Sequence, residues 1–464
     1  ILVQKEVMNM ENSIFQEKRI SKAYIVLSLP LVMSMVVSLV YNLADTYFVA
    51  QTNNTDLVAG VSLGAPVFTL LMAFGNVFAQ GGSSLISRLL GQKDVQNARR
   101  VSSFSFYVSI ITGAVIGALL LLLRTPMLYL LGATADTFAH ASAYYVWLAV
   151  GAPAVVLSFI HSNLLRTEGL SKESMMGSVL GTVINIVLDP ILISVLGMGA
   201  AGAAIATVIG YLCTDVFLAV IVYKKSPNLS MQPKEIRIRG SFVGQILGIG
   251  IPAALVNVLQ SISVILTNQF LLPYGNETIA AMGIAMKVSM IALLVIVGFC
   301  FGGSPLFGYY YGANNRERLQ ACFRFSFRFL IVIAAILTVL VCIAAPVLIR
   351  GMMDQESIIM HGTLMLRWQV LTMIFVAINT LITIICQSTG KIIPSFILSI
   401  SRQGFVFVIV LLITSNLFGY GGVIRAQAIA DIISAVMAVV IFAKVFGSYL
   451  KTDGEQKIAV PVSE

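Results

Sequence analysis

The sequence predicts an all-α integral membrane protein in which twelve transmembrane helices form two pseudo-symmetric six-helix bundles. Hydrophobic residues make up 58% of the 464 residues, charged residues only 11%, and the mean hydropathy is +0.94, far above that of a soluble domain. Roughly twelve apolar stretches of about 17 to 30 residues are each long enough to cross a hydrocarbon core of about 30 Å. In addition, several landmark residues recur about 221 positions later, which indicates an internal duplication.

The first copy contains six expected spans, each an apolar run that ends at charged or turn residues. They cover residues 24–50, 57–87, 102–123, 141–163, 174–196 and 200–223. The second copy repeats the pattern with spans over residues 243–272, 278–311, 325–349, 363–387, 395–415 and 421–446. The second and eighth spans are rich in glycine, so their ends are the least sharply marked.

Four pairs of landmarks define the duplication: Pro30 with Pro252, Gly91 with Gly312, Gly169 with Gly390, and Gly202 with Gly422. Because each copy has an even number of spans, the second copy starts on the same side of the membrane as the first. A pseudo-twofold axis along the membrane normal can then relate two lobes around a central cavity, an arrangement typical of transporters. The alternative is a duplicated but rigid helical scaffold.

One polar stretch divides the chain sensibly, the linker of residues 224–242. We therefore expect a cytoplasmic N-terminal segment (1–23), an N-terminal lobe (24–223), this linker, a C-terminal lobe (243–446) and a cytoplasmic tail (447–464).

Lysine and arginine gather on one side of the predicted topology, and such residues mark the cytoplasmic side. They occupy the N-terminus (Lys5, Lys18, Arg19, Lys22), the loop after the second span (Arg88, Lys93, Arg99, Arg100), the linker (Lys224, Lys225, Lys234, Arg237, Arg239) and the loop after the eighth span (Arg316, Arg318, Arg324, Arg328). The opposite loops offer little beyond Arg124 and Arg350. Both termini are therefore expected in the cytoplasm. The net charge of +9 reflects this asymmetry and does not indicate binding of nucleic acid.

The rare acids inside apolar spans are the candidate functional residues, because a carboxylate in the membrane is costly unless it faces a cavity or a partner. Asp45 lies near the outer end of the first span, and Asp189 lies in the outer third of the fifth. Thr207 in the sixth span occupies about the same depth. Asn185 and Asp189 share one helical face, as do Asn42 and Asp45, so these oxygens could hold a proton or a sodium ion. The alternative is that they only pack helices through hydrogen bonds.

Other polar residues in the spans are weaker candidates for a functional role. Asp215, deeper in the sixth span, and Asp431 could pair with Arg425 or a helix end. Arg402 could snorkel or line the cavity, and snorkelling is the favoured alternative. His161 is a lone imidazole that favours a structural role over a proton relay.

The second copy has no equivalent acid pair and contributes amides and a methionine stripe. Asn257 and Gln260 lie in the seventh span, while Met282, Met286 and Met290 recur every fourth residue in the eighth, which also contains Lys287. Such a stripe usually packs in a core, yet methionine also adapts to ligands of different shape. These six residues are the candidate lining of a substrate cavity.

With these motifs in place, the chain resembles the multidrug and toxic compound extrusion (MATE) family, specifically its bacterial MepA-type branch with DinF-like features. The motifs that carry the resemblance are Ser28-Leu29-Pro30, Asn42-Leu43-Ala44-Asp45, Leu89-Leu90-Gly91, Arg166-Thr167-Glu168-Gly169, the segment from Asn185 through Asp189 and Pro190, and the segment from Gly202 to Thr207. Each glycine motif alone is weak, but six in order within a duplicated chain are specific.

The resemblance implies an antiporter, not an enzyme, that exports organic cations or amphipathic drugs in exchange for H⁺ or Na⁺ by alternating access. It implies a coupling-ion site at Asp45, Asn185, Asp189 and Thr207, bending of the first span at Pro30, no cofactor, and a monomer in the bacterial cell membrane. The chain departs from the NorM-like pattern because its seventh and tenth spans lack acids, which leaves the capture of cationic drugs to the acids of the first lobe.

Two other classes remain. A flippase of the same broad superfamily, moving a lipid or lipid-linked oligosaccharide, would be expected to hold cations for phosphate in its cavity. A membrane enzyme would need a nucleophile elbow, a phosphate-binding glycine loop or a histidine-rich metal motif, none of which the sequence contains.

Overall fold

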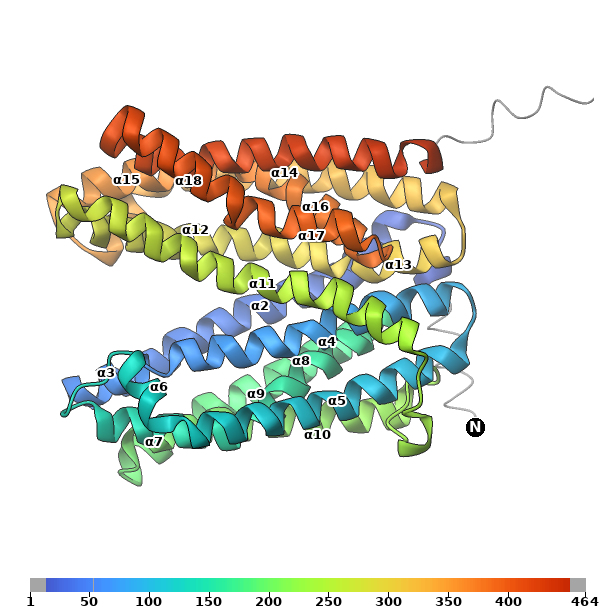
Figure 1. Cartoon of the computed structure of the whole chain (residues 1–464), viewed down its shortest axis with the longest axis horizontal. Coiled ribbons are helices and arrows are strands. Elements are labelled where there is room, and N and C mark those ends of the chain that lie inside the picture. Colours follow the sequence, from blue (N-terminus) through green and yellow to red (C-terminus); the bar gives the residue numbers. More distant parts are fainter. Residues whose placement is uncertain (1–13, 53, 451–464) are drawn as a thin grey trace, which may run out of the picture.

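The computed structural model describes residues 14–52 and 54–450, which form helices and short connections without a β-strand (Figure 1). We call residues 20–225 the N-lobe. It contains α2 (Ile20–Ala50), α3 (Thr55–Ser62), α4 (Ala65–Gly91), α5 (Val95–Leu122), α6 (Arg124–Leu130), α7 (Phe138–Val150), α8 (Ala152–Thr167), α9 (Ser171–Pro190), the π-helix η1 (Ile191–Val195) and α10 (Gly199–Lys225).

We call residues 240–450 the C-lobe, and a linker with the short 3₁₀ helix η2 (Pro233–Glu235) precedes it. It contains α11 (Gly240–Leu271), the 3₁₀ helix η3 (Leu272–Tyr274), α12 (Asn276–Gly302), α13 (Ser304–Gly312), α14 (Arg316–Met352), α15 (Glu356–Leu371), α16 (Met373–Ser388), α17 (Ile392–Gln403) and α18 (Phe405–Leu450). Most of the expected N-terminal segment and C-terminal tail lies outside the described residues.

The helices of the described chain account for the twelve predicted spans. Nine helical segments are long and apolar enough to cross a membrane, and two further pairs, α7 with α8 and α15 with α16, qualify as bent spans. The last of the nine segments, residues 392–447, is broken at Gly419, whose φ of 53° and ψ of −130° interrupt the helix. Counting that segment as two spans gives twelve, so the predicted fold class is confirmed.

Several spans are less regular than the sequence analysis expected, and three of the breaks occur at a Gly-x-Pro sequence. Gly64, Gly151 and Gly303 each precede a helix with proline at its first or second position, namely α4, α8 and α13. Proline fits the first turn of a helix, where its missing N–H is not needed. The helix is interrupted at each of these points, and α7 and α8 meet at an angle of 52°.

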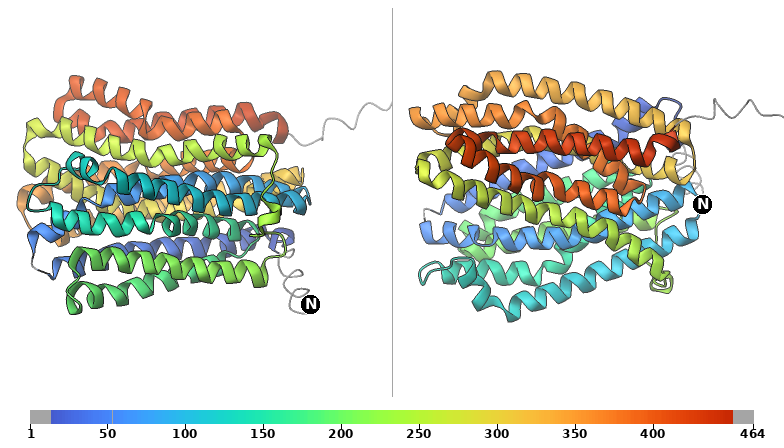
Figure 2. Two further views of the ribbon diagram at one scale, coloured as in Figure 1. Left: turned by 60° about the horizontal axis from the view of Figure 1, so that its bottom comes forward. Right: turned by 45° about the horizontal axis from the view of Figure 1, so that its top comes forward.

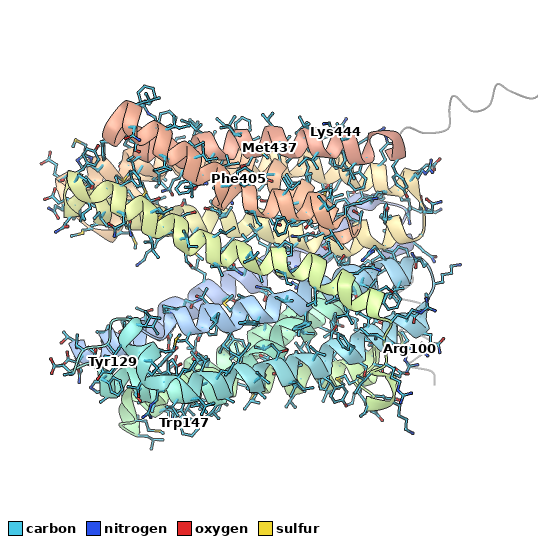
Figure 3. All side chains as sticks on the ribbon, viewed as in Figure 1. Arg100, Tyr129, Trp147, Phe405, Met437 and Lys444 are labelled. Atoms are coloured by element: carbon cyan, nitrogen blue, oxygen red, sulfur yellow. The ribbon has the colours of Figure 1, made fainter. Side chains whose placement is uncertain are left out.

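The helices of both lobes run roughly along the same long direction (Figure 2). One large apolar core lies mainly in the C-lobe and also contains Ala23, Tyr24, Leu27 and Val32 of α2. Two smaller cores lie mainly in the N-lobe. In the N-lobe, Tyr129 and Trp147 mark one end of the molecule and Arg100 marks the other (Figure 3). The lobes diverge toward the end of Tyr129 and meet at the end of Arg100, where the linker also lies.

The end where the lobes meet, the closed end, is held by hydrogen bonds and close backbone approach. Tyr24 of α2 donates to the carbonyl of Phe299 in α12 (2.7 Å), and Arg88 of α4 donates to the side chain of Gln245 in α11 (3.0 Å). The helices are close enough that a Cβ on Gly250 would lie 1.8 Å from a carbonyl oxygen of α4. Only glycine fits such a contact.

The landmark glycines of the two repeats occupy equivalent places. A Cβ on Gly91 would lie 2.1 Å from the carbonyl oxygen of Tyr309 in α13, and a Cβ on Gly312 would lie 2.1 Å from that of Arg88 in α4. Gly169 and Gly390 both have positive φ, +90° and +74°, after corresponding helices. The duplication read from the sequence is therefore repeated in the backbone.

The first part of the linker is bound to the N-lobe. On α5, Ser102 donates to the carbonyl of Ser230 (3.1 Å), and Tyr107 donates to that of Met231 (3.0 Å). At the end of α8, the Glu168 carboxylate accepts the backbone N–H of Asn228 (2.8 Å). Residues 226–235 thus travel with the N-lobe.

Candidate cation site and substrate cavity

A cavity of about 530 Å³ lies between the lobes, within the size range of small-molecule sites. Its wall comes from α2, α4, α8, α9 and α10 of the N-lobe and from α11, α12, α16 and α17 of the C-lobe. Amides from both lobes face it, including Asn76, Gln80, Asn257, Gln260, Asn379 and Gln387, together with aromatic and methionine side chains. The cavity offers apolar contact and many neutral hydrogen-bonding groups.

Two arginines, Arg166 and Arg402, are the charged side chains of this wall in the described chain. Arg402 forms an ion pair with the buried Asp431 (Nε to Oδ1, 2.8 Å). Arg166 is itself buried, and its guanidinium donates to the neutral amide of Asn163. The cavity wall therefore carries a net positive charge, whereas the sequence analysis expected acids to capture cationic drugs.

Three helices of the N-lobe bring the predicted cation-site residues together at Thr207 of α10. Its hydroxyl lies 3.1 Å from the hydroxyl of Tyr41 on α2 and accepts the amide N–H of Asn185 on α9 (3.4 Å). Asn185 and Thr207 face the cavity, whereas Asp45 and Asp189 are not part of its wall. Asp45 is close enough to Asp189 to act on it electrostatically.

Several oxygens of this cluster have no hydrogen-bond donor in the described chain. Asp189 is fully buried, and neither of its carboxylate oxygens has a hydrogen-bond partner within the described chain. The same holds for one oxygen of Asp45 and for the amide oxygen of Asn185. Buried oxygens without donors are unfavourable unless a proton or a metal ion satisfies them. The cluster therefore fits H⁺ or Na⁺, although no group of three or more His, Cys, Asp or Glu side chains occurs in the described residues.

Three tyrosines surround the cluster, and the sequence analysis did not single them out. Tyr41 bonds to Thr207, while Tyr144 of α7 and Tyr211 of α10 interact electrostatically with each other, and Tyr144 also with both acids. Spacing could have revealed two of them, because Tyr41 precedes Asp45 by four residues and Tyr211 follows Thr207 by four. Tyr144 lies in another span, so no spacing rule identifies it.

The supporting residues of the prediction lie apart from the cluster. Asn42 faces the cavity, but its amide donates to the carbonyl of Ser38 in its own helix (2.7 Å). Pro30 lies inside α2, more than three turns before Asp45. Asp215 faces His161, with 3.8 Å between the nearest carboxylate oxygen and ring nitrogen. His161 is therefore not a lone imidazole.

In the C-lobe, Asn257 and Gln260 line the cavity, but the methionine stripe does not line it. Met282 is buried in the C-lobe core and Met286 packs against it. Met290 is 48% exposed, and Lys287 is also exposed. None of these four residues is part of the cavity wall in the described chain, whose methionines are Met35, Met72 and Met175.

Asp431 has three partners, none of which was expected. Besides Arg402, it accepts hydrogen bonds from Gln427 (2.9 Å) and Thr372 (3.0 Å). Arg425 lies over the ring of Trp368 instead, 5.1 Å from its centroid. Sequence spacing could suggest only Gln427, which precedes Asp431 by one turn.

Comparison with protein families identifies the chain's relatives. A family model described as MatE matches residues 30–191 and again residues 252–414. The chain is 32% identical over 427 residues to the multidrug export protein MepA of Staphylococcus haemolyticus, which covers 92% of this chain and 94% of that protein. It is 31% identical, with the same coverage, to MepA of Staphylococcus aureus strain MRSA252.

Solved structures show the same architecture. A structure described as MATE in the straight conformation has a TM-score of 0.89 and 25% identity, covering 95% of this chain and 99% of its own. An outward-facing multidrug resistance MATE family transporter gives 0.88 and 26%, with 94% and 98% covered. A Pyrococcus furiosus transporter gives 0.87 and 25%, with 95% and 98% covered, and its description states that a reversed polarity of the binding pocket suggests a different function.

Proposed function

Since the chain belongs to the MatE family, we propose that it is a multidrug efflux transporter that couples export to the entry of H⁺ or Na⁺. Its relatives are named multidrug export proteins, so small organic molecules are the substrate class and the chain is not an enzyme. We place it in a bacterial cell membrane as a monomer with both termini in the cytoplasm. The lobes then diverge toward the outside.

One observation supports this proposal above the others: both oxygens of Asp189 and one oxygen of Asp45 are buried without a hydrogen-bond partner in the described chain. Asn185 and Thr207 belong both to the cation cluster and to the wall. An ion bound at the acids and a drug bound in the cavity therefore contact the same two side chains. This shared wall gives a physical route by which each can alter the binding of the other.

Alternating access requires only that ion and drug favour different states of the lobes. With the lobes apart, a cation from outside reaches the cluster and satisfies the oxygens of Asp45 and Asp189, while the drug leaves the cavity. The lobes then close at that end and separate at the closed end, and the ion leaves to the cytoplasm. A buried carboxylate provides a bias of several kcal/mol, about what a shift from 1:99 to 99:1 requires.

The coupling ion and the site are tested together in proteoliposomes that hold ethidium under either a proton or a sodium gradient. We expect export by the wild type to follow one of the two gradients. Asp45→Asn and Asp189→Asn, which keep side-chain size but cannot ionise, should each lower gradient-driven export at least about tenfold.

The matched control is Asp354→Asn, because Asp354 is an exposed aspartate whose only ion pair here joins it to Arg350 one turn away (3.4 Å). It should export at the wild-type rate. Normal export by both Asp45→Asn and Asp189→Asn would refute the coupling site. Loss of export in all three variants would indicate that they are unfolded, which thermal melting would detect.

A lipid flippase is the second candidate, favoured by Arg166, a buried cavity arginine that has no carboxylate partner in the described chain. Arginine suits the phosphate of a lipid or lipid-linked sugar. If the wild type moves a fluorescent phospholipid across liposomes but not ethidium, and if Arg166→Gln abolishes that movement, the flippase replaces the drug exporter.

A further inference from the structure

A second pair of titratable side chains lies in the N-lobe, outside the cluster of Asp45 and Asp189. His161 of α8 is 2% exposed and Asp215 of α10 is 6% exposed. Their nearest atoms, Nδ1 and Oδ1, are 3.8 Å apart, too far for a direct hydrogen bond but close enough for strong electrostatic attraction. Neither ring nitrogen and neither carboxylate oxygen has a hydrogen-bond partner among the described residues.

This absence of partners argues against a purely structural pair. Buried polar groups that only stabilise a fold are normally hydrogen-bonded, and here four polar atoms are not. The imidazole ring instead lies against Phe106 of α5, with centroids 5.2 Å apart. An apolar neighbour holds the ring in place without fixing where its proton resides.

Few titratable side chains of the described helices lie close to the pair along the chain. No residue of α4 before Arg88 is titratable, and α9 has none between Glu173 and Asp189. On α5, Tyr107 donates to the linker, and on α8, Arg166 donates to Asn163. On α10, Tyr211 lies one turn before Asp215, and Asp215 acts on it electrostatically.

The position of the pair places it between the cation cluster and the closed end. Thr207, Tyr211 and Asp215 follow one another at four-residue intervals along one face of α10, so Asp215 lies about 12 Å beyond Thr207 toward that end. Tyr211 interacts electrostatically with Tyr41 and Tyr144, which border Asp45. A continuous row of polar groups thus runs from the cluster to the pair.

The same direction leads to Glu168, seven residues after His161 and therefore on the same side of α8. Glu168 lies just beyond the helix and is 2% exposed, and one of its oxygens has no partner in the described chain. Burial raises the pKa of Glu168 from about 4.5 to about 7, so it can accept and release a proton near neutral pH.

We propose that His161 and Asp215 form a second proton-binding site of the N-lobe, through which the coupling proton passes from the Asp45 and Asp189 cluster toward the cytoplasm. The pair binds and releases one proton as a unit, since an aspartate with an imidazolium and a neutral carboxyl with a neutral imidazole contain the same number of protons. The inference rests on the proposed antiport and narrows its coupling ion to H⁺, because an imidazole beside a carboxylate suits a proton better than sodium.

The first test is a titration of ¹⁵N-histidine-labelled protein by NMR. The chain has three histidines, so the signal lost in His161→Gln identifies His161. We expect the chemical shifts of the His161 ring nitrogens to change with pH, and to change differently in Asp215→Asn. A His161 signal that does not change with pH in the wild type would overturn the proposal. If His161→Gln does not fold, wild-type spectra in which none of the three histidine signals changes with pH would overturn it equally.

The second test separates this site from the coupling cluster in proteoliposomes. Proton-driven ethidium export should fall at least about tenfold in His161→Gln and Asp215→Asn, whereas ethidium exchange at equal pH on both sides needs no net proton release and should stay within about twofold. Asp215→Glu, which retains a carboxylate, should recover part of the driven rate. The control Ser105→Ala, at another buried polar side chain of the N-lobe, should leave both rates unchanged.

The two proposals fail in different ways. Wild-type protein that shows no proton-driven export would refute proton antiport and this inference with it. If the wild type shows proton-driven export and both His161→Gln and Asp215→Asn export normally, the second site is refuted and proton antiport is not.

Discussion

At the scale of single residues, Asp189 and Glu168 show how the surroundings of a buried carboxylate decide its role. Asp189 is fully buried with no donor for either oxygen, whereas Glu168 accepts the backbone N–H of Asn228. The first arrangement leaves the oxygens open for a cation, and the second ties the end of α8 to the linker. Both cost free energy through desolvation, but only Glu168 recovers part of it within the fold.

We expect the stability of the protein to depend on pH through Glu168. Because burial raises the pKa of its carboxyl from about 4.5 to about 7, the folded state holds this proton more tightly than the unfolded state. Below pH 4.5 the carboxyl is protonated in both states, and the folded state has the full stabilisation that this proton provides. That stabilisation is lost as the pH rises to about 7. The wild type should lose about 3 kcal/mol of unfolding free energy as the pH rises through this interval. Glu168→Gln cannot ionise but can still accept the hydrogen bond from Asn228, so it should not show this loss.

The melting temperatures of purified wild type and Glu168→Gln, measured from about pH 4 to about pH 8, test this pH dependence. Their difference should grow through the interval between the two pKa values and then level off. The control is Glu356→Gln, an exposed glutamate in the first turn of α15, which should melt like the wild type. A difference between wild type and Glu168→Gln that is the same at every pH would contradict the assigned burial effect.

Asp431 neutralises Arg402 in a buried ion pair of the C-lobe. Removing one partner of a buried ion pair leaves the other charge uncompensated, so Asp431→Leu should destabilise the protein by about 3 to 5 kcal/mol. The double variant Arg402→Met with Asp431→Leu should recover most of that loss, because both charges are removed. Thermal melting of the two variants measures the difference, and equal destabilisation of both would show that the pair is not coupled.

At the scale of helices, small local motifs decide where a span bends and where it meets its neighbours. The Gly-x-Pro motifs before α4, α8 and α13 interrupt spans that the hydropathy pattern reads as continuous. The glycines of the closed end act differently, since they remove the Cβ where two backbones touch. Hydropathy counts both kinds of glycine as apolar residues and therefore detects neither.

Adding a methyl group at the closed end should open it. Gly91→Ala and Gly312→Ala would each place a Cβ 2.1 Å from a carbonyl oxygen of the other lobe, a distance that real Cβ atoms do not reach. The helices must then separate, so the population with the lobes apart at this end should rise. Spin labels at Arg100 and Lys444, which lie at this end on opposite lobes, would report a longer distance.

The matched control is Gly283→Ala in α12, where a Cβ would meet no atom within 4 Å. It should leave the spin-label distance unchanged, and alanine should even favour the helix slightly. Unchanged distances in both Gly91→Ala and Gly312→Ala would mean that the contact does not control the separation of the lobes.

At the scale of the whole molecule, much of the architecture could be predicted from sequence because membrane spans and repeats are strong, additive signals. Twelve spans, the duplication and the nearness of Asn185 and Thr207 all followed from hydropathy, glycine and proline landmarks, and depth. Three-dimensional partners did not follow, because they join helices far apart in the chain. His161 with Asp215, Arg402 with Asp431, and Tyr144 beside the acids depend on helix rotation, which hydropathy does not encode.

The placement of the methionines illustrates the same limit. Met282 and Met35 are equally apolar, yet one packs in the C-lobe core and the other lines the cavity. In a membrane protein the lipid-facing, core and cavity surfaces of a helix can all be apolar, so composition alone does not separate them.

The contact between Gly91 and α13, mirrored by Gly312 and α4, also bears on how such a chain could arise. A contact in which each repeat offers the same backbone surface to the other is self-complementary, the geometry of a two-fold homodimer. A six-helix ancestor could thus have paired with a second copy of itself before gene duplication and fusion made the pairing permanent. Since these two glycine contacts use main-chain atoms, side chains elsewhere in the two halves could diverge without disturbing them, and Asp45 and Asp189 have no counterpart in the second half.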